Sequence, residues 1–235
     1  MPVAIITGAS RGLGRAVARS LAERGWGLVL DARGADDLAT VADELRAVTT
    51  VTALPGDIAD PAHRDALVAA AAALGSVDLL INNASDLGPS PLPALAELPL
   101  DQLEAVYRTN VLAPLGLVQR ALPLLRHGGG TIVNVTSDAA VQDYEGWGGY
   151  GSSKAALDQL GNVLAAEEQD VRVYRFDPGD MRTQMHQDAF PGQDISDRPE
   201  PETVVPALLR LLDERPPSDR YQAGDLLRAT MGVER

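Results

Sequence analysis

Residues 3–21 read VAIITGASRGLGRAVARSL, and this stretch decides how the chain folds. It opens with an apolar, β-branched run, which is typical of a strand buried on both faces of a parallel sheet. A short glycine-rich turn follows. From Leu13 to Leu21 apolar residues then recur at the spacing of one helix face, and Gly25 suits a helix end. The stretch therefore predicts a strand, a tight turn and a helix in direct succession.

The same alternation continues along the chain. The predicted strands cover residues 3–7, 27–31, 51–55, 77–82, 131–136 and 171–176, with a shorter candidate at 220–224. The predicted helices cover residues 12–25, 35–48, 61–74, 100–125, 154–169 and 202–214. Repeated strand–helix–strand units indicate a doubly wound α/β fold, a parallel sheet with helices on both faces.

One region interrupts this rhythm. Residues 180–202 are rich in proline, glycine, aspartate and glutamine. Loops of this length within a compact domain are usually either functional lids or disordered. Because we find no internal repeat and no linker, we expect a single domain over residues 1–235, with a substrate lid at about 180–202.

Composition excludes several classes of protein. The 235 residues are 45% hydrophobic, enough for one sizeable core, and the net charge of −13 argues against a nucleic-acid surface. The chain has no cysteine, which fits a reducing compartment and excludes disulfides and thiolate metal sites. We see no signal peptide and no apolar run of the roughly 20 residues that a membrane span requires. We therefore expect a cytoplasmic protein without membrane or nucleic-acid partners.

Two hydrolytic classes lack their motifs. The three histidines, His63, His127 and His186, are scattered without ligand spacing, so we expect no metal. No G-x-S-x-G elbow marks a serine nucleophile either.

The glycine turn points to a phosphate ligand. Gly8, Gly12 and Gly14 allow a tight turn and a close approach of ligand to backbone. The helix that follows offers free N–H groups and the positive end of its dipole to a diphosphate. A glycine-rich turn alone also serves plain geometry, but its place between first strand and first helix favours a dinucleotide.

A second stretch, YGSSKAAL at residues 150–157, places Tyr150 and Lys154 on one helix face. An ordinary phenol holds its proton tightly at neutral pH, and a nearby ammonium favours the phenolate. We therefore expect Lys154 to make the phenolic proton labile. Taken by itself, the pair could also be a packed tyrosine ring beside a lysine that reaches solvent.

Four motifs together resemble those of the short-chain dehydrogenase/reductase family: TGASRGLG at residues 7–14, INNAS at 81–85, YGSSK at 150–154 and PGDMRT at 178–183. They follow the family's order over essentially the whole chain. The resemblance implies a Rossmann-like sheet in the order 3-2-1-4-5-6-7 and hydride transfer between NAD(P)(H) and a small carbonyl or alcohol. It also implies a homodimer or homotetramer, joined through helices that start near Leu100 and Gly151.

The resemblance assigns catalytic roles to four residues. Tyr150 is the expected general acid and base, and Lys154 binds the ribose of the nicotinamide. Ser137 orients the substrate carbonyl. Asn110 kinks the fourth helix and positions a water that leads to the lysine.

The family's cofactor contacts carry over as well. They are Gly8, Ser10, Arg11, Gly12, Leu13, Gly14, Arg33, Asp57, Ile58, Asn83, Ala84, Tyr150, Lys154, Pro178, Gly179 and Thr183. Two positions depart from the pattern, because Ser85 replaces a glycine and Asp180 stands where the family often has an apolar residue.

The end of the second predicted strand bears on cofactor choice. An acidic residue there binds a ribose 2′-hydroxyl, whereas an arginine accepts a 2′-phosphate. The family's discriminating aspartate falls at Ala32 and its arginine at Arg33, with Arg11 assisting. Asp31 is expected to cap or orient Arg33. We favour NADP(H) and leave NAD(H) open.

Two rivals remain at this level. One is a catalytically silent NADP(H)-binding sensor or scaffold, and the other is an NAD-dependent catabolic alcohol dehydrogenase. The substrate cannot be read directly, but Tyr144 and Trp147 lie among acidic residues. That composition favours a neutral or cationic apolar carbonyl compound over an anionic acyl thioester.

Overall fold

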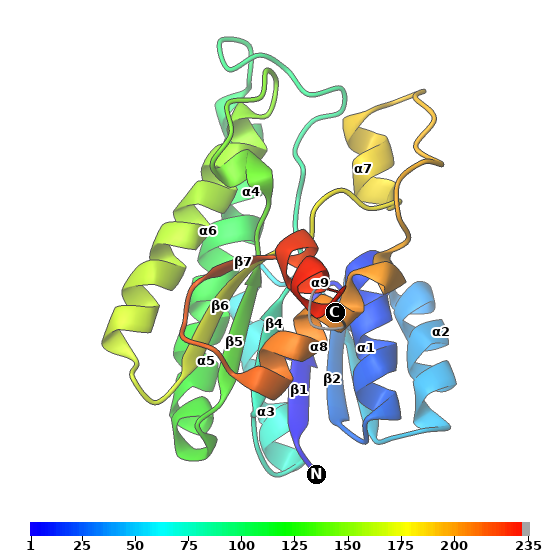
Figure 1. The fold of residues 1–235 in the computed structure, drawn as a ribbon, viewed down its shortest axis with the longest axis vertical. Helices are drawn as coiled ribbons and strands as arrows, with labels where there is room; N and C mark the ends of the chain where they lie inside the picture. The colour runs from blue at the N-terminus through cyan, green and yellow to red at the C-terminus, as the bar shows by residue number, and fades with distance from the viewer. Residues whose placement is uncertain (232–235) are drawn as a thin grey trace.

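Parallel strands form one sheet in the order β3-β2-β1-β4-β5-β6-β7, which confirms the expected fold (Figure 1). The computed structural model describes residues 1–231. The strands are β1 Val3–Ile6, β2 Gly27–Ala32, β3 Val51–Pro55, β4 Leu79–Asn82, β5 Thr131–Val135, β6 Arg172–Asp177 and β7 Arg220–Gln222. The strand order reverses between β1 and β4, and open α/β sheets bind their ligands at the carboxyl ends of the strands beside such a reversal.

Alternate residues of the central strands pack on opposite faces of the sheet. Ala4 and Ile6 of β1 join a core with the helices α1, α2 and α8. Val3 and Ile5 join a second core with α3 and α5. Every residue of β1, β2, β4 and β5 is buried, which is why their sequences are apolar runs rather than polar–apolar alternations.

The helices begin and end at local sequence signals. They are α1 Gly12–Glu23, α2 Ala35–Arg46, α3 Pro61–Ala73, α4 Leu100–Tyr107, α5 Ala113–Gly128, α6 Gly148–Glu167, α7 Gln184–Ala189, α8 Val205–Glu214 and α9 Ala223–Met231. The side chain of Asp60 caps α3 by accepting a hydrogen bond from the Ala62 N–H at 2.9 Å, and Pro61 occupies the first turn. Gly129, with φ of 61°, ends α5 in the left-handed conformation that glycine favours.

Two predicted helices differ from the observed ones in ways that matter for the site. The helix predicted over residues 100–125 is divided, because the π-helical turn Arg108–Leu112 joins α4 to α5. The helix predicted from Lys154 begins at Gly148, so Tyr150 and Lys154 both lie in its first turns.

The C-terminal part holds more helix than predicted. The segment 180–202 contains α7 and the start of the 3-10 turn Pro201–Thr203. β7 gives way at once to α9, where the sequence suggested strand as far as Gly224. Figure 1 shows α7 beyond the carboxyl ends of the strands. Within residues 1–231 no helix is both long and apolar enough to cross a membrane.

Candidate active site

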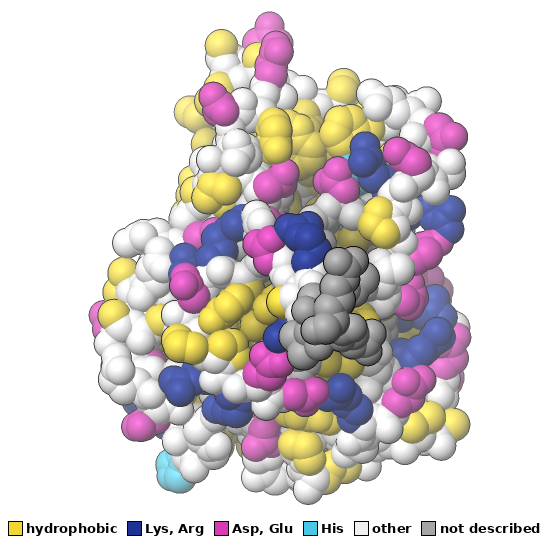
Figure 2. Space-filling view, viewed as in Figure 1, with side chains coloured by type: hydrophobic (Ala, Val, Ile, Leu, Met, Phe, Trp, Pro, Cys, Tyr) yellow, Lys and Arg dark blue, Asp and Glu magenta, His cyan; other side chains and the backbone are white. Residues whose placement is uncertain are grey.

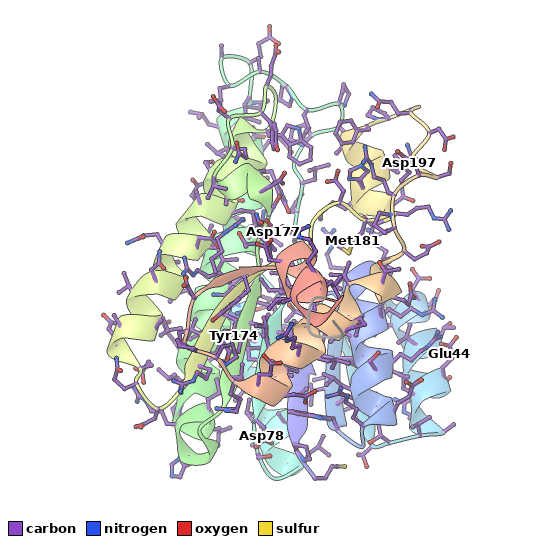
Figure 3. The ribbon with its side chains drawn as sticks, viewed as in Figure 1. Glu44, Asp78, Tyr174, Asp177, Met181 and Asp197 are labelled. Carbon is purple, nitrogen blue, oxygen red and sulfur yellow. The ribbon has the colours of Figure 1, made fainter. Side chains whose placement is uncertain are left out.

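A cavity of about 1030 Å³ opens at the carboxyl ends of the strands. The glycine turn, the end of β2, the segment after β4 and the segment after β6 line it. Figure 2 shows hydrophobic side chains gathered at the end of the molecule that carries α7, with acidic side chains below them. Figure 3 places Asp177 and Met181 between the end of β6 and α7. The volume suits a dinucleotide together with a small substrate.

The glycine turn lies directly against the end of β4. A Cβ on Gly14 would meet the Gly8 oxygen at 2.3 Å, and Gly8 itself has φ of 65°. The side-chain amide of Asn83 fixes the turn by donating to the Thr7 and Gly8 carbonyls at 2.8 and 3.1 Å. No side chain caps the N-terminus of α1 at Arg11, so its first N–H groups stay available to an anion. These features fit the diphosphate of a dinucleotide.

Almost all predicted site residues meet at this cavity. Those of the predicted residues that line the cavity are Gly8, Ser10, Arg11, Gly12, Leu13, Arg33, Asp57, Ile58, Asn83, Ala84, Ser137, Tyr150, Lys154, Pro178, Gly179 and Thr183. Gly14 and Asn110 lie behind the lining, where Gly14 packs under the turn and Asn110 is fully buried.

Tyr150 is a buried phenol at the wall of the cavity. Its ring lies edge-on to Trp147, with centroids 5.7 Å apart. Burial raises the pKa of Tyr150 above its ordinary value of 10.0, and the nearby carboxylates of Asp177 and Asp138 add to the rise. Hydrogen bonds between the phenol and the hydroxyls of Ser85 and Ser137 lower the pKa only in part. At neutral pH the phenol therefore carries its proton.

Lys154 lies one helical turn along and is also buried. Its Nζ donates to the Val135 carbonyl at 2.9 Å and lies 5.5 Å from the centroid of the Tyr150 ring. Burial lowers the pKa of Lys154 to about 8, although the charge of Asp158 opposes the shift. Burial disfavours the charged form of both groups, so it opposes the effect of Lys154 on the phenolic proton that we expect.

Ser137 follows β5 and begins a short turn. Its hydroxyl accepts from the Ala139 N–H at 3.2 Å and donates to the Asp138 carboxylate at 3.1 Å. Its backbone carbonyl accepts from Arg220 at 3.0 Å, and the same guanidinium pairs with Asp177 at 2.9 Å. Arg220 thus ties the end of β5 to the end of β6. The sequence did not mark it, because a single arginine on a short strand carries no motif.

Asn110 occupies the π-helical turn and uses both ends of its side chain. Its Oδ1 accepts from the Ser85 hydroxyl at 3.1 Å and from the Asp86 N–H at 2.7 Å. Its Nδ2 donates to the Asp86 carbonyl and, at 2.9 Å, to the Ser153 hydroxyl, which in turn donates to the Tyr150 carbonyl. Asn110 lies in the π-helical turn that interrupts the predicted helix, and its side chain joins the segment after β4 to α6. Its role in positioning a water stays a prediction.

Ser85 is a site residue that the sequence marked only as a departure from the family's pattern. Its hydroxyl bonds both Asn110 and the phenol of Tyr150, and it lines the cavity. The signal was present in the sequence, since a side chain replaced a glycine next to the site. Only the fold shows where its hydroxyl points.

The expectation that Asp31 caps or orients Arg33 is wrong, because Asp31 pairs with His63 instead. Its carboxylate is buried and lies 2.7 Å from Nε2 of His63 at the start of α3. Arg33 and Arg11 are exposed on the cavity wall, and neither forms an ion pair within residues 1–231. The end of β2 thus presents arginine, not carboxylate, to the solvent.

The half of the cavity beyond Tyr150 is aromatic and acidic. Trp147 lies 6.0 Å from Phe190 and 6.5 Å from Tyr144, centroid to centroid. The Tyr144 hydroxyl donates to Asp138 at 2.9 Å. Asp180 also lines this half, close to His186 and Arg198.

Comparison with known proteins agrees with this geometry. The family model described as short chain dehydrogenase matches residues 2–194. Sepiapterin reductase of Mus musculus is 35% identical over 199 residues, which cover 79% of this chain and 76% of that protein. A rhamnolipids biosynthesis 3-oxoacyl-[acyl-carrier-protein] reductase of Pseudomonas aeruginosa is 36% identical over 172 residues, 70% of this chain and 66% of that protein.

A solved structure is similar over nearly the full length. The alcohol dehydrogenase of the archaeon Thermococcus sibiricus, complexed with 5-hydroxy-NADP, superposes with a TM-score of 0.85 at 29% identity. The match covers 94% of this chain and 95% of that one. The fold, the glycine turn, the clustered tyrosine, lysine, serine and asparagine, and the family match agree, and the chain belongs to the short-chain dehydrogenase family of oxidoreductases.

Proposed function

We propose that the protein reduces the carbonyl group of small-molecule ketones or aldehydes to alcohols, with NADP(H) as cofactor and Tyr150 as general acid. The observation that carries this proposal is the buried phenol of Tyr150 at the wall of the cavity, beside Ser137 and one helical turn from Lys154. Reduction needs a proton for the alkoxide that develops on the carbonyl oxygen, and the Tyr150 hydroxyl is a proton donor at this wall of the cavity. Ser137 would hold the same oxygen by a hydrogen bond.

Different residues along the cavity would bind different parts of the cofactor. When bound, NADP(H) would supply the hydride. The glycine turn and the N-terminus of α1 would hold its diphosphate, and Lys154 its nicotinamide ribose. Arg11 and Arg33 would hold the 2′-phosphate, beside Asp57 and Ile58 at the adenine. The Lys154 Nζ lies 5.5 Å from the centroid of the Tyr150 ring, so its charge would act on the phenol during proton transfer.

Turnover of a substrate panel tests the proposal. Purified protein is mixed with NADPH and small ketones and aldehydes, and the loss of NADPH absorbance is followed. We expect turnover with at least one class of carbonyl compound. Binding of NADPH without turnover of any member would favour the silent sensor or scaffold. Activity confined to alcohols with NAD⁺ would favour the catabolic dehydrogenase.

The preference for NADP(H) rests on the two exposed arginines and on the withdrawal of Asp31 to His63. A similar solved protein is complexed with an NADP derivative. Arg33→Ala should weaken NADPH binding about 10- to 100-fold, the loss of a charge-assisted phosphate contact, and change NADH binding by less than about twofold. Arg24→Ala, which removes an exposed arginine paired with Asp213, is the matched control. Equal losses for both cofactors would contradict the assignment.

We propose a flat, apolar substrate that is neutral or cationic. The aromatic rings of Trp147 and Phe190 and the side chains of Met181 and Met185 offer apolar walls, and carboxylates lie around them. Matched aryl ketones with an amine or a carboxylate substituent separate the classes. We expect kcat/KM at least about tenfold higher for the amine. A preference for the carboxylate, or efficient reduction of an acyl-carrier thioester, would contradict this assignment.

The segment 180–202 is proposed as the lid of this half, since α7 brings Met185, His186 and Phe190 to the cavity. Subunits are proposed to meet through α4, α5 and α6, where Leu100, Leu112 and Val163 are exposed. Light scattering of the purified protein should then give the mass of a dimer or a tetramer. The absence of cysteine supports a reducing, cytoplasmic setting.

A further inference from the structure

Asp31 and His63 form a buried pair behind the adenosine end of the cavity. The carboxylate of Asp31 ends 2.7 Å from Nε2 of His63, and the two side chains are only 3% and 10% exposed. The second carboxylate oxygen accepts from the Gly8 N–H at 3.4 Å, and the Asp31 carbonyl accepts from the Ala9 N–H at 2.8 Å. The pair therefore joins β2, the glycine turn and α3.

His63 is held in place from its other side. A Cβ on Gly56 would meet the ring at 2.4 Å, so the turn after β3 packs directly on the imidazole. Asp57, the next residue, lines the cavity and adds its negative charge to this corner. Burial raises the pKa of Asp31, whereas the hydrogen bond and charge of His63 lower it. The His63 hydrogen bond therefore helps the buried carboxylate to remain ionised.

The pair also adjoins the residues that distinguish the two cofactors. Asp31, Ala32 and Arg33 are consecutive and all line the cavity. The carboxylate of Asp31 is therefore two residues along the chain from Arg33, the residue proposed to bind the 2′-phosphate. An uncompensated carboxylate at this place would repel a 2′-phosphate and weaken the pull of the arginine. We propose that His63 is a cofactor-specificity residue, which holds Asp31 in a charge-compensated pair and so allows a 2′-phosphorylated dinucleotide to bind. This inference rests on the proposed use of NADP(H).

Four proteins test it: the wild type, His63→Gln, Asp31→Asn and the double variant. Glutamine keeps a donor near the place of Nε2 but carries no charge. Dissociation constants for NADPH and NADH are measured at pH 7 by fluorescence titration. We expect His63→Gln to weaken NADPH about tenfold and NADH by less than about twofold, the effect of one uncompensated charge near a bound phosphate. Asp31→Asn should bind NADPH at least as tightly as the wild type, and the double variant should regain that affinity.

The ratio of the two constants separates charge from folding, because a damaged pocket weakens both cofactors together. His127→Gln, on the exposed end of α5, is the matched control and should leave the ratio unchanged. An unchanged ratio in His63→Gln, or a double variant that stays weak, would overturn the inference. Arg33→Ala tells the two failures apart. If it loses NADPH selectively while His63→Gln does not, cofactor choice stands without the pair; if neither variant is selective, the proposed use of NADP(H) has failed.

Discussion

At the scale of single residues, the proton donor depends on hydroxyl groups that the chain places around it. Ser85 and Ser137 bond the phenol of Tyr150, and Asn110 holds Ser85 in turn. Each of these bonds crosses between segments that lie far apart in the sequence. The reactivity of Tyr150 is therefore a property of the assembled edge of the sheet, not of the YGSSK motif.

Ser85→Ala tests this network. The hydroxyl of Ser85 lowers the pKa of Tyr150, so its removal should make the phenol a weaker acid. We also expect kcat to fall about 2- to 10-fold, the range of one lost hydrogen bond. Ser152→Ala is the control, because that exposed hydroxyl donates to the carbonyl of Gly149 within its own helix. A kcat no lower than that of the control would show that Ser85 is not coupled to the phenol.

Burial of Lys154 in the active site should lower the free energy of unfolding of the protein. Burial lowers its pKa in the folded chain from 10.5 to about 8, so between these values the unfolded chain binds more protons and stability rises with pH. Below pH 8 the folded protein carries the full cost of a buried charge. Lys154→Met removes this buried charge, a gain of roughly 3 kcal/mol, but also loses the hydrogen bond to the Val135 carbonyl. The free energy of unfolding of the cofactor-free protein should thus rise by about 1–2 kcal/mol at pH 7.

Urea unfolding at pH 7 and at pH 9.5 checks the sign. The advantage of the methionine variant should shrink at the higher pH, because the wild-type lysine is then neutral in the folded state. A variant less stable than the wild type at pH 7 would show that Lys154 is not destabilised by burial.

At the scale of elements, the π-helical turn between α4 and α5 is the joint of the site. The side chain of Asn110 in this turn forms four hydrogen bonds to the segment after β4 and to α6. π-helical turns are often found at functional sites, and here the extra residue aims one amide at both neighbours. The turn fixes α6 at the carbonyl of Tyr150 through Ser153.

Asn110→Ala should destabilise the protein by about 2–4 kcal/mol, because it leaves buried partners without hydrogen bonds. The free energy of unfolding in urea measures the effect. Asn162→Ala serves as control, since that exposed asparagine on α6 donates to Gln159 one turn away on the same helix. A loss no larger than that of the control would mean that the turn holds its shape without the amide.

Strand and helix positions could largely be predicted, because their signal is local. Apolar runs marked the buried strands, and the glycine turn marked where β1 gives way to α1. The π-helical turn could not be placed from periodicity, because one extra residue shifts the apolar spacing by a single position within a continuous amphipathic pattern. α7 and α9 were missed because proline, glycine and aspartate surround short helices that tertiary contacts stabilise.

At the scale of the whole molecule, one cavity joins both halves of the sheet. Its walls come from the glycine turn and β2 on one side and from β5, α6 and α7 on the other. A ligand that spans it should stabilise the entire fold. With NADPH at about 100 times its dissociation constant, we expect roughly 2.7 kcal/mol of stabilisation and a rise in Tm of about 5–10 °C. Calorimetry measures this rise, and an unchanged Tm would contradict binding along the cavity.

The sequence identified which residues meet at the site but not their electrostatic state. The motifs brought Tyr150, Lys154, Ser137 and Asn110 together correctly, because the family's spacing reflects strand ends and helix starts. The pairing of Asp31 with His63, and the raised pKa of Tyr150, arise from burial summed over distant segments. Such sums cannot be read from a linear pattern.

Tyr150→Phe measures the central claim most directly. The substitution removes one hydroxyl and keeps the ring against Trp147, so the cavity should still bind NADPH with a dissociation constant within about twofold of the wild type. We predict that kcat for carbonyl reduction falls by about 10²- to 10⁴-fold, the usual contribution of a positioned proton donor. A variant that binds NADPH and reduces the same substrate at the wild-type rate would contradict the account.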